Sequence, residues 1–308
     1  MEWAWSLLVW FFVILSPVFF LLRQRPQSGS IRLPPEPPGW PVFGHLFNLG
    51  TTPHRTLARL KQQYGPIIWL RLGSTNTIAV LTAKAAAELF KNHDLSFADR
   101  TITDTNRSHD YYLGSLALAP YGSYWRFLRR ICTVEMLVNK RISETVPIRQ
   151  KCVNDMLLWI EKDSQLVKDE QGIQVAWFVF LASFNMIGNL VVSRDLADPE
   201  SKVGSEFFTA MRVAIELAGQ PNISDLFPCL RWLDLQGLRR KIDRNLGKAM
   251  KIASGFVKER MKELEENGER RKDFMDVLLE FEGTGKDEPA KLLERDVTIF
   301  ILREASLC

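Results

Sequence analysis

The N-terminal twenty-two residues place the strongest constraint on what this chain can fold into. No charged residue occurs in residues 3–22, and thirteen of those twenty positions are Leu, Phe, Val or Ile. A helix of that length rises about 30 Å, which matches the hydrocarbon thickness of a bilayer. Arg23, Arg25 and Arg32 follow the span, and basic flanks of this kind stay on the cytosolic side. The sequence predicts a single-pass signal anchor in membrane lipid, with a lumenal N-terminus and a cytosolic body.

A cleaved secretory signal is the competing interpretation of these residues. Such signals begin with basic residues, carry an apolar core of about 7–15 residues and end at a small-x-small cleavage site. Here Glu2 precedes the core, the apolar run is longer, and no Ala-x-Ala follows. A retained anchor fits the sequence better.

A proline-rich segment comes next, with five of the fifteen prolines in residues 34–41. Proline fixes φ and disfavours helix in the residue before it, so we expect a semi-rigid extended spacer. The alternative is a proline-rich ligand for a partner domain. The spacer is favoured because a segment between an anchor and a folded body already has a mechanical use.

Composition and charge exclude several classes of protein. With 46% hydrophobic and 25% charged residues, the chain is globular rather than disordered. Forty basic and 36 acidic residues give a net charge of only +4, which does not favour nucleic acid as a partner. The cysteines, Cys132, Cys152, Cys229 and Cys308, form no CxxC pair and have no histidine at ligand spacing, so we predict no metal site and no disulfide scaffold.

The body is predicted to be mainly α with a small β-sheet. Residues 53–64 and 83–92 have helical spacing, and residues 67–72 and 77–82 are predicted to form a hairpin around a loop at 73–76. Residues 97–121 are loop-like. Further helices are predicted at 124–137, 143–162, 175–192, 205–217, 238–266, 273–282 and 292–302.

The longest predicted helix carries one apolar stripe, which we interpret as core packing. Its members recur at three- and four-residue steps: Leu246, Met250, Ala253, Val257, Met261 and Leu264.

Common catalytic signatures fail. The residues around Gly285-Lys286 suggest phosphate binding, but the first glycine of a GxxxxGK loop would be position 280, which is Glu280. No GxGxxG, GxSxG or HExxH occurs.

One pair of residues is informative. Trp125 and Arg129 are four apart on a predicted helix and share a face. An indole N–H and a guanidinium are pure donors, so the pair could bind a carboxylate. The alternative is that the tryptophan packs and the arginine is solvated.

Several motifs occur together in a specific order. They are Leu33-Pro-Pro-x-Pro-Pro-Gly-Trp-Pro-x-Phe-Gly44, Tyr64-Gly-Pro66, Ser96-Phe-Ala-Asp-Arg100, Tyr121-Gly-x-Tyr-Trp-Arg-x-x-Arg-Arg130, Lys272-Asp-Phe274 and Asp276-Val-Leu-Leu279. In this order they resemble the N-terminal half of a plant microsomal cytochrome P-450, most closely family 76, whose members include terpenoid hydroxylases. Glu36 and Thr101 depart from the family pattern, which usually has glycine and proline there.

The resemblance implies an incomplete cytochrome P-450 fold preceded by a single transmembrane helix. The implied segments are an anchor at 1–22, a basic and proline-rich hinge at 23–50, a portion of the catalytic domain at 51–302 and an off-family tail at 303–308. The implied cofactor is heme b, with NADPH-derived electrons delivered by a cytochrome reductase at the endoplasmic reticulum membrane. The implied reaction is hydroxylation of a small lipophilic, terpenoid-like substrate with O2.

The resemblance also implies roles for individual residues. Arg100, Trp125 and Arg129 would contact heme propionates, and Arg126 and Arg130 would face the reductase. Residues 102–120 and 207–220 would contribute to the substrate side. The named candidates there are Ile102, Leu116, Leu118, Phe208 and Met211.

The heme-thiolate loop of the family is not found in these residues. None of the four cysteines has glycine two positions later, and no E-x-x-R occurs. We therefore assign no catalytic residue and predict that this chain alone is inactive, since the axial thiolate drives O–O cleavage. Cys308 is a disfavoured substitute ligand. The alternative function is a non-catalytic membrane-anchored remnant that binds partners such as a reductase.

Overall fold

The computed structural model describes residues 33–166, 172–197, 202–268, 270–271, 273–286 and 288–305, together with Phe11 and Leu15. The rest of the predicted anchor, and Cys308, lie outside the described residues. The chain divides into two compact units. The first comprises the chain up to Phe97 together with Asp225–Cys229, and the second comprises Ala98–Ser224 and Leu230–Cys308.

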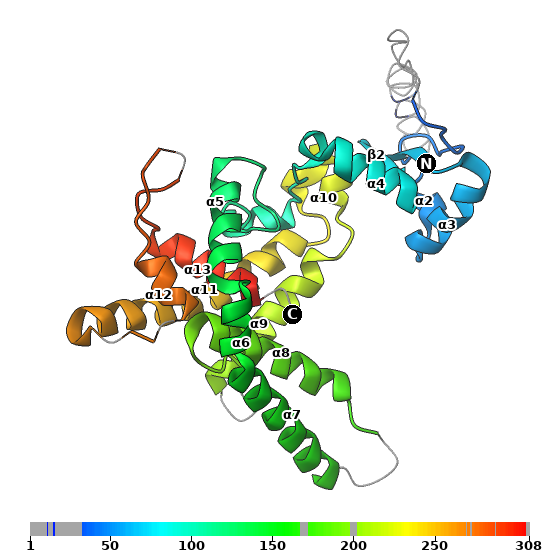
Figure 1. Cartoon of the computed structure of the whole chain (residues 1–308). Coiled ribbons are helices and arrows are strands. Elements are labelled where there is room, and N and C mark those ends of the chain that lie inside the picture. The colour runs from blue at the N-terminus through cyan, green and yellow to red at the C-terminus, as the bar shows by residue number, and fades with distance from the viewer. Residues whose placement is uncertain are drawn as a thin grey trace. The chain divides into compact units, whose positions relative to one another are not determined.

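The first unit combines short helices with a two-stranded sheet. Two of its helices confirm the sequence prediction. α3 begins at Pro53, where the missing N–H costs no hydrogen bond, and it ends before Gly65, whose φ is 92°. α4 begins after Thr82, whose hydroxyl accepts a hydrogen bond from the N–H of Ala85. The elements are α2 (Leu46–Leu49), α3 (Pro53–Tyr64), β1 (Ile67–Leu72), β2 (Thr75–Val80), α4 (Ala83–Asn92) and a 3-10 helix at Asp94–Phe97 (Figure 1).

The hairpin is tighter than predicted. β2 starts at Thr75 rather than at residue 77, and it pairs antiparallel with β1 from Leu72↔Thr75 to Ile67↔Val80. Only Gly73 and Ser74 connect the strands, and Gly73 has a φ of 61°. This left-handed conformation suits the two-residue turn of a hairpin, so the four-residue loop of the prediction was wrong.

A distant segment completes this unit. The carbonyl of Leu226 accepts hydrogen bonds from the backbone N–H and the hydroxyl of Ser74, at 2.9 and 2.8 Å. A Cβ at Gly73 would lie 2.6 Å from the same carbonyl oxygen, so the close approach requires glycine. We call Asp225–Cys229 the strap, because it fastens a later part of the chain onto the hairpin turn.

The second half of the proline-rich segment packs on β1. The Pro35 carbonyl accepts from the N–H of Trp69 at 2.9 Å. The buried ring of His45 donates to the Pro37 carbonyl and accepts from the N–H of Arg71, at 2.7 and 2.9 Å. From Pro35 onward these residues therefore belong to the folded unit.

The second unit is helical. Its helices are α5 (Ser123–Ile131), α6 (Asn139–Glu144), α7 (Val146–Leu166), α8 (Val175–Val192), α9 (Lys202–Ala218), α11 (Leu238–Asn267), α12 (Phe274–Leu279) and α13 (Glu294–Ala305). The short α10 (Ile223–Leu226) runs into the strap, and 3-10 turns span Thr105–Asp110 and Pro228–Leu233. Within the described residues, a mainly α fold with a small sheet is confirmed.

Three predicted helices differ from the structure. The helix predicted at 124–137 is α5 followed by a π-helical segment, Cys132–Met136. The helix predicted at 143–162 starts later, at Val146, and a separate α6 precedes it. α12 is shorter than the predicted 273–282, because Asp273 is its cap and Glu280 ends it.

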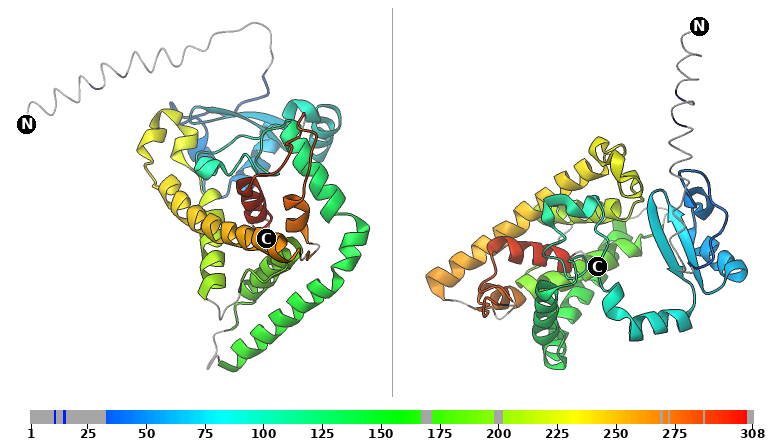
Figure 2. Two further views of the ribbon diagram at one scale, coloured as in Figure 1. Left: turned by 90° about the vertical axis from the view of Figure 1, so that its left-hand side faces the viewer. Right: turned by 90° about the horizontal axis from the view of Figure 1, so that it is seen from above.

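The second half of α8 lies in the core of the second unit, whereas Val175, Trp177 and Val179 near its start are exposed. Phe184 and Val191 are 0% and 1% exposed, and α8 contacts α7, α12 and α13. Of the described helices, α8 is the one long and apolar enough to cross a membrane. Since its apolar residues pack against three other helices, we interpret it as a core helix. Figure 2 shows α13, in red, beside the long α11, with which it also packs.

The apolar stripe of α11 is buried over only part of its length. Leu246, Ala253 and Val257 are at most 5% exposed, whereas Met261 is 38% exposed. The buried position in that turn is instead Arg260. The prediction of core packing is thus confirmed for the first turns of the stripe and wrong for Met261.

Candidate functional site

α5 carries a row of alternating cations and aromatic rings. The Tyr121 and Trp125 ring centroids are 5.5 Å apart. The guanidinium carbon of Arg126 lies 5.6 Å from the Tyr121 centroid, and that of Arg129 lies 5.2 Å from the Trp125 centroid. The opposite face of the helix, with Phe127, Leu128 and Ile131, is buried. Packing of that face therefore turns the cationic row outward.

The predicted pairing of Trp125 with Arg129 is thus present as a stacked pair. Arg129 is exposed and Trp125 is half-buried. Within the described residues, the guanidinium N–H groups of Arg129 have no hydrogen-bond partner, so the donors of this side chain face solvent. Stacking limits the freedom of the arginine and leaves those donors available to an anion.

The indole N–H of Trp125 is already engaged. It donates to the carbonyl of Leu116 at 2.8 Å. This bond ties the predicted substrate loop to α5. Trp125 could contact a carboxylate only by giving up the bond to Leu116.

Arg100 lies in a turn that is linked to the residues just before α5. Its guanidinium donates to the carbonyl of Ala98 at 2.7 Å. The carboxylate of Asp99 accepts from the N–H groups of Arg100 and Tyr121, both at 3.1 Å. Asp99 therefore fixes the backbone of Arg100 beside the aromatic row, while the Arg100 side chain itself is exposed.

The two residues predicted to face a reductase differ in their surroundings. Both Arg126 and Arg130 are exposed. Arg126 stacks on Tyr121, whereas Arg130 forms an ion pair with Glu288.

The substrate-side candidates separate into two groups. Ile102, Leu116 and Leu118 are half-buried, and the two leucines pack against the core. Phe208 and Met211 are 1% and 2% exposed within the core itself. Phe208 meets the rings of Trp177, Phe180 and Phe184 edge to face, with centroids 4.9, 5.1 and 5.4 Å away.

One further group on α5 has a perturbed acidity. Burial, followed by the negative charge of Asp296 on α13, raises the pKa of the Tyr124 phenol well above its usual value. Tyr124 therefore stays neutral.

Comparison with known proteins decides the family. The cytochrome P450 family model matches residues 34–303. The chain belongs to the cytochrome P450 family. It is 56% identical over 304 residues to cytochrome P450 76A2 of Solanum melongena, covering 98% of this chain and 60% of that protein. It is 46% identical over 295 residues to an iridoid oxidase of Catharanthus roseus, covering 94% and 57%.

A more distant relative is the geraniol 8-hydroxylase of Catharanthus roseus, which is 31% identical over 282 residues, covering 92% of this chain and 55% of that protein. These matches confirm the resemblance to plant family 76. The chain spans about three-fifths or less of the length of these relatives.

The residues of this cytochrome P450 chain fit the propionate end of a heme. Arg129 and Arg100 offer exposed guanidinium groups, and the stacking on Trp125 holds the first in place. The described cysteines, in contrast, do not offer a suitable ligand for the heme iron. Cys132 and Cys152 are buried and Cys229 is exposed. Burial, with the nearby Asp195 charge, raises the pKa of the Cys152 thiol, which disfavours the thiolate that an iron ligand requires.

Metal-binding side chains are dispersed in the described part of the chain. In those ranges, no group of three or more His, Cys, Asp or Glu residues lies close enough to hold a metal ion.

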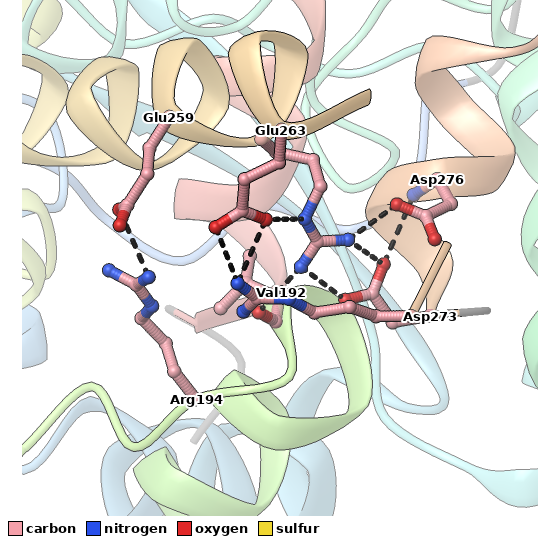
Figure 3. A network of polar contacts seen from close by, with 8 residues as sticks. Val192, Arg194, Glu259, Glu263, Asp273 and Asp276 are labelled. Carbon is pink, nitrogen blue, oxygen red and sulfur yellow. Dashed lines mark hydrogen bonds and ion pairs between the residues drawn. The ribbon is translucent and has the colours of Figure 1, made fainter. Parts of the chain in front are cut away.

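Sequence reasoning missed a buried charged cluster among the described residues of this P450 chain. Arg260 on α11 is 2% exposed and donates to both carboxylate oxygens of Asp273, at 3.0 and 2.9 Å (Figure 3). It also forms an ion pair with Asp276 and donates to the carbonyl of Val192 at 3.3 Å. Asp273 in turn caps α12 by accepting from the N–H of Asp276 at 3.1 Å. One guanidinium thus joins α8, α11 and α12.

The electrostatics of this cluster favour the charged arginine. Burial alone lowers the pKa of Arg260, but hydrogen bonds and charge from Asp273 and Asp276 outweigh it and leave the pKa raised. A signal was present in the sequence, because Arg260 follows Val257 by three residues on the apolar stripe. A charged residue at a core-facing position requires a buried partner.

Proposed function

We propose that this chain provides the substrate-facing loop and the propionate donors of a heme-dependent monooxygenase that hydroxylates a small lipophilic, terpenoid-like substrate. The observation that carries the proposal is the family match over residues 34–303. The names of two relatives, iridoid oxidase and geraniol 8-hydroxylase, support the substrate class.

Heme supplies the oxygen chemistry when bound, with electrons from NADPH through a reductase. We propose that this chain holds the heme propionates and orients the substrate. Arg129 would donate charge-assisted hydrogen bonds to a propionate from its stacked position on Trp125. Arg100 would be a second contact, held by Asp99. Leu116 and Leu118 would present apolar surface to the substrate.

The proposed reductase contact is the exposed side of α5. Arg126 and Arg130 would attract acidic groups of the partner. Arg130 would exchange its ion pair with Glu288 for one with the partner, so its net contribution should be smaller than that of Arg126.

We also propose the anchored topology, with an anchor at 1–22, a hinge at 23–50, a P450 body at 51–302 and a tail at 303–308. The sequence has two sequons, at Asn106 and at Asn222, and both are poor reporters of topology. The Asn222 side chain is 6% exposed and its oxygen accepts from the N–H of Ser224, while Ser108 of the other sequon is 1% exposed and donates to the carboxylate of Asp243. Arg141→Thr would make the exposed Asn139 a glycosylation acceptor. With a cytosolic body, this variant expressed in cells should show no endoglycosidase-sensitive mass shift. A shift would contradict the topology.

Residues 1–308 alone should not sustain the reaction, since they contain no Cys-x-Gly sequence. The test compares two proteins: this chain, and this chain joined to the remaining portion of the Solanum melongena relative. With heme and reductase supplied, the joined protein should give a thiolate-type ferrous–CO difference band and NADPH-dependent oxidation of geraniol. The chain alone should give neither.

Two results would change this proposal, one for the chain alone and one for the joined protein. If the chain alone gave a thiolate-type band and Cys308→Ser abolished it, Cys308 would be an iron ligand. That result would overturn the prediction that none of the four cysteines binds the heme iron. A joined protein that binds heme but never turns over any terpenoid would favour the alternative, a membrane-anchored protein that binds partners without catalysis.

A further inference from the structure

The predicted substrate loop contains a turn with unusual backbone angles. His109 and Asp110 have φ angles of 52° and 53°, so two consecutive residues that are not glycine occupy the left-handed region. Each such residue costs about 1–2 kcal/mol relative to ordinary backbone. Surrounding contacts must therefore hold this turn in place.

α11 holds one side of the turn. The Ser108 hydroxyl donates to the carboxylate of Asp243, and the His109 ring donates to the Asp243 carbonyl at 3.0 Å. The ring lies against Gly247, where an added Cβ would come within 3.2 Å of the imidazole. Just before the turn, the fully buried Asp104 pairs with Arg239 at 3.0 Å.

On the α13 side of the turn, one side chain bonds to both His109 and Asp110. Arg295 donates to the carbonyl of His109 at 2.8 Å and to the carboxylate of Asp110 at 3.2 Å. These are the two residues with left-handed backbone. One guanidinium thus fixes both.

The same face of α13 meets the loop again four residues later. A Cβ on Gly114 would lie 2.6 Å from a methyl carbon of Ile299, so the backbone there packs directly on α13. Because Arg295 and Ile299 are four apart, they share one face of the helix. Leu116 follows two residues on and is tied to Trp125. The loop is therefore fixed at successive points between the strained turn and the predicted substrate-facing leucines.

We propose that Arg295 is a positioning residue for the substrate loop: it keeps the His109–Asp110 turn in its strained conformation and thereby sets where Leu116 and Leu118 lie. The inference rests on the substrate-facing role proposed for residues 102–120. Without Arg295, the turn can relax toward ordinary backbone and the loop loses its register against α13.

The test is amide hydrogen exchange on the full chain in detergent, with neither heme nor substrate. The reporting amides are those of Tyr111 and Leu113, which donate to Ser108 and Asp110, both at 3.0 Å. Arg295→Ala should speed their exchange by about threefold to tenfold, since an exposed ion pair with one further hydrogen bond is lost. Arg295→Lys should restore part of the protection. The control, Arg194→Ala, removes a partly exposed pair with Glu259 and a stacking contact with Phe256, and should leave these amides unchanged.

A second pair of variants isolates the strain. In the Arg295→Ala background, Asp110→Gly loses no further partner from α13 and tolerates the left-handed φ, so protection should increase. Asp110→Ala removes the same carboxylate but keeps the strain, so protection should not increase. Equal exchange in the two double variants, or unchanged exchange in Arg295→Ala, would overturn the proposal. The proposal would also be overturned if, in the parent protein, the amides of Tyr111 and Leu113 exchanged as fast as in an unfolded chain.

Failure here is distinguishable from failure of the proposed function. Exchange reports the position of the loop without any reaction. Oxidation by the joined protein tests the reaction, whatever the exchange result.

Discussion

Two arginines of the second unit show opposite uses of the same side chain. Arg260 is 2% exposed and directs its donors at three carboxylates, those of Asp273, Asp276 and Glu263, and at a carbonyl of the chain itself. Arg129 is exposed, rests on one face of Trp125 and directs its donors outward. The donors of Arg260 are therefore satisfied within the chain, whereas those of Arg129 remain available to a ligand.

The difference separates stability from binding. A buried guanidinium with matched carboxylates holds helices together, and it has no capacity left for a ligand. A stacked, exposed guanidinium adds little to folding, because water already solvates its charge, and it is ready to bind an anion. Substitution of the two should therefore give opposite results for unfolding and for heme binding.

The largest expected effect is on folding. Arg260→Ala leaves Asp273 and Asp276 buried without their cation, which should lower the free energy of unfolding by about 3–5 kcal/mol. Urea denaturation of the full chain measures this. Arg194→Ala is the matched control: it removes a partly exposed ion pair with Glu259 and stacking on Phe256, and it should cost about 1–2 kcal/mol. Similar losses in the two variants would contradict the role of Arg260 in holding the helices together.

An intermediate effect is expected on heme retention. In the joined protein, Arg129→Ala should lower the free energy of heme binding by about 1.5–3 kcal/mol, because a propionate loses its charge-assisted partner. Urea denaturation should show a loss of no more than about 1 kcal/mol, the value of an exposed cation–π contact. Heme transfer to apomyoglobin measures retention. Retention equal to that of the parent would contradict the role assigned to Arg129.

The smallest effect extends the comparison to the cysteines. Cys152 is 1% exposed, and burial raises its thiol pKa, so the unfolded chain ionises at lower pH than the folded one. Its contribution to stability is complete below the unfolded pKa and is lost as pH rises through the folded pKa. Unfolding free energy should therefore fall more steeply at alkaline pH in the parent than in Cys152→Ala.

Alkylation by iodoacetamide gives an independent check in a Cys308→Ser background. The exposed Cys229 should react quickly, and the buried Cys132 and Cys152 should react slowly. Rapid modification of Cys152 in the folded chain would contradict its burial.

Local patterns predicted the helices well, because periodicity and end signals lie within a few residues of each other. Residues 53–64, 83–92 and 175–192 match α3, α4 and α8, and each is bounded by local signals such as Gly65 or Thr82. The spacing of Trp125 and Arg129 likewise predicted their shared face. That they hold a propionate stays a prediction.

Features that depend on distant partners were not predictable in the same way. The indole of Trp125 meets Leu116, nine residues earlier, and Arg260 meets Asp273, thirteen residues later across a helix end. The hairpin turn is set partly by Leu226, which is about 150 residues away in the chain. Periodicity contains no information about such pairings, which depend on the assembled fold.

The strap has a consequence for how the protein is made. Residues up to Phe97 leave the ribosome long before Asp225–Cys229, so Ser74 cannot find its acceptor on Leu226 until most of the second unit has been synthesised. At about 5–20 residues per second, that interval is on the order of ten seconds. Until then, the N–H and hydroxyl of Ser74 in the hairpin turn can donate only to water. The first unit is therefore started first but can be completed only after the segment Ala98–Ser224 of the second unit has been synthesised.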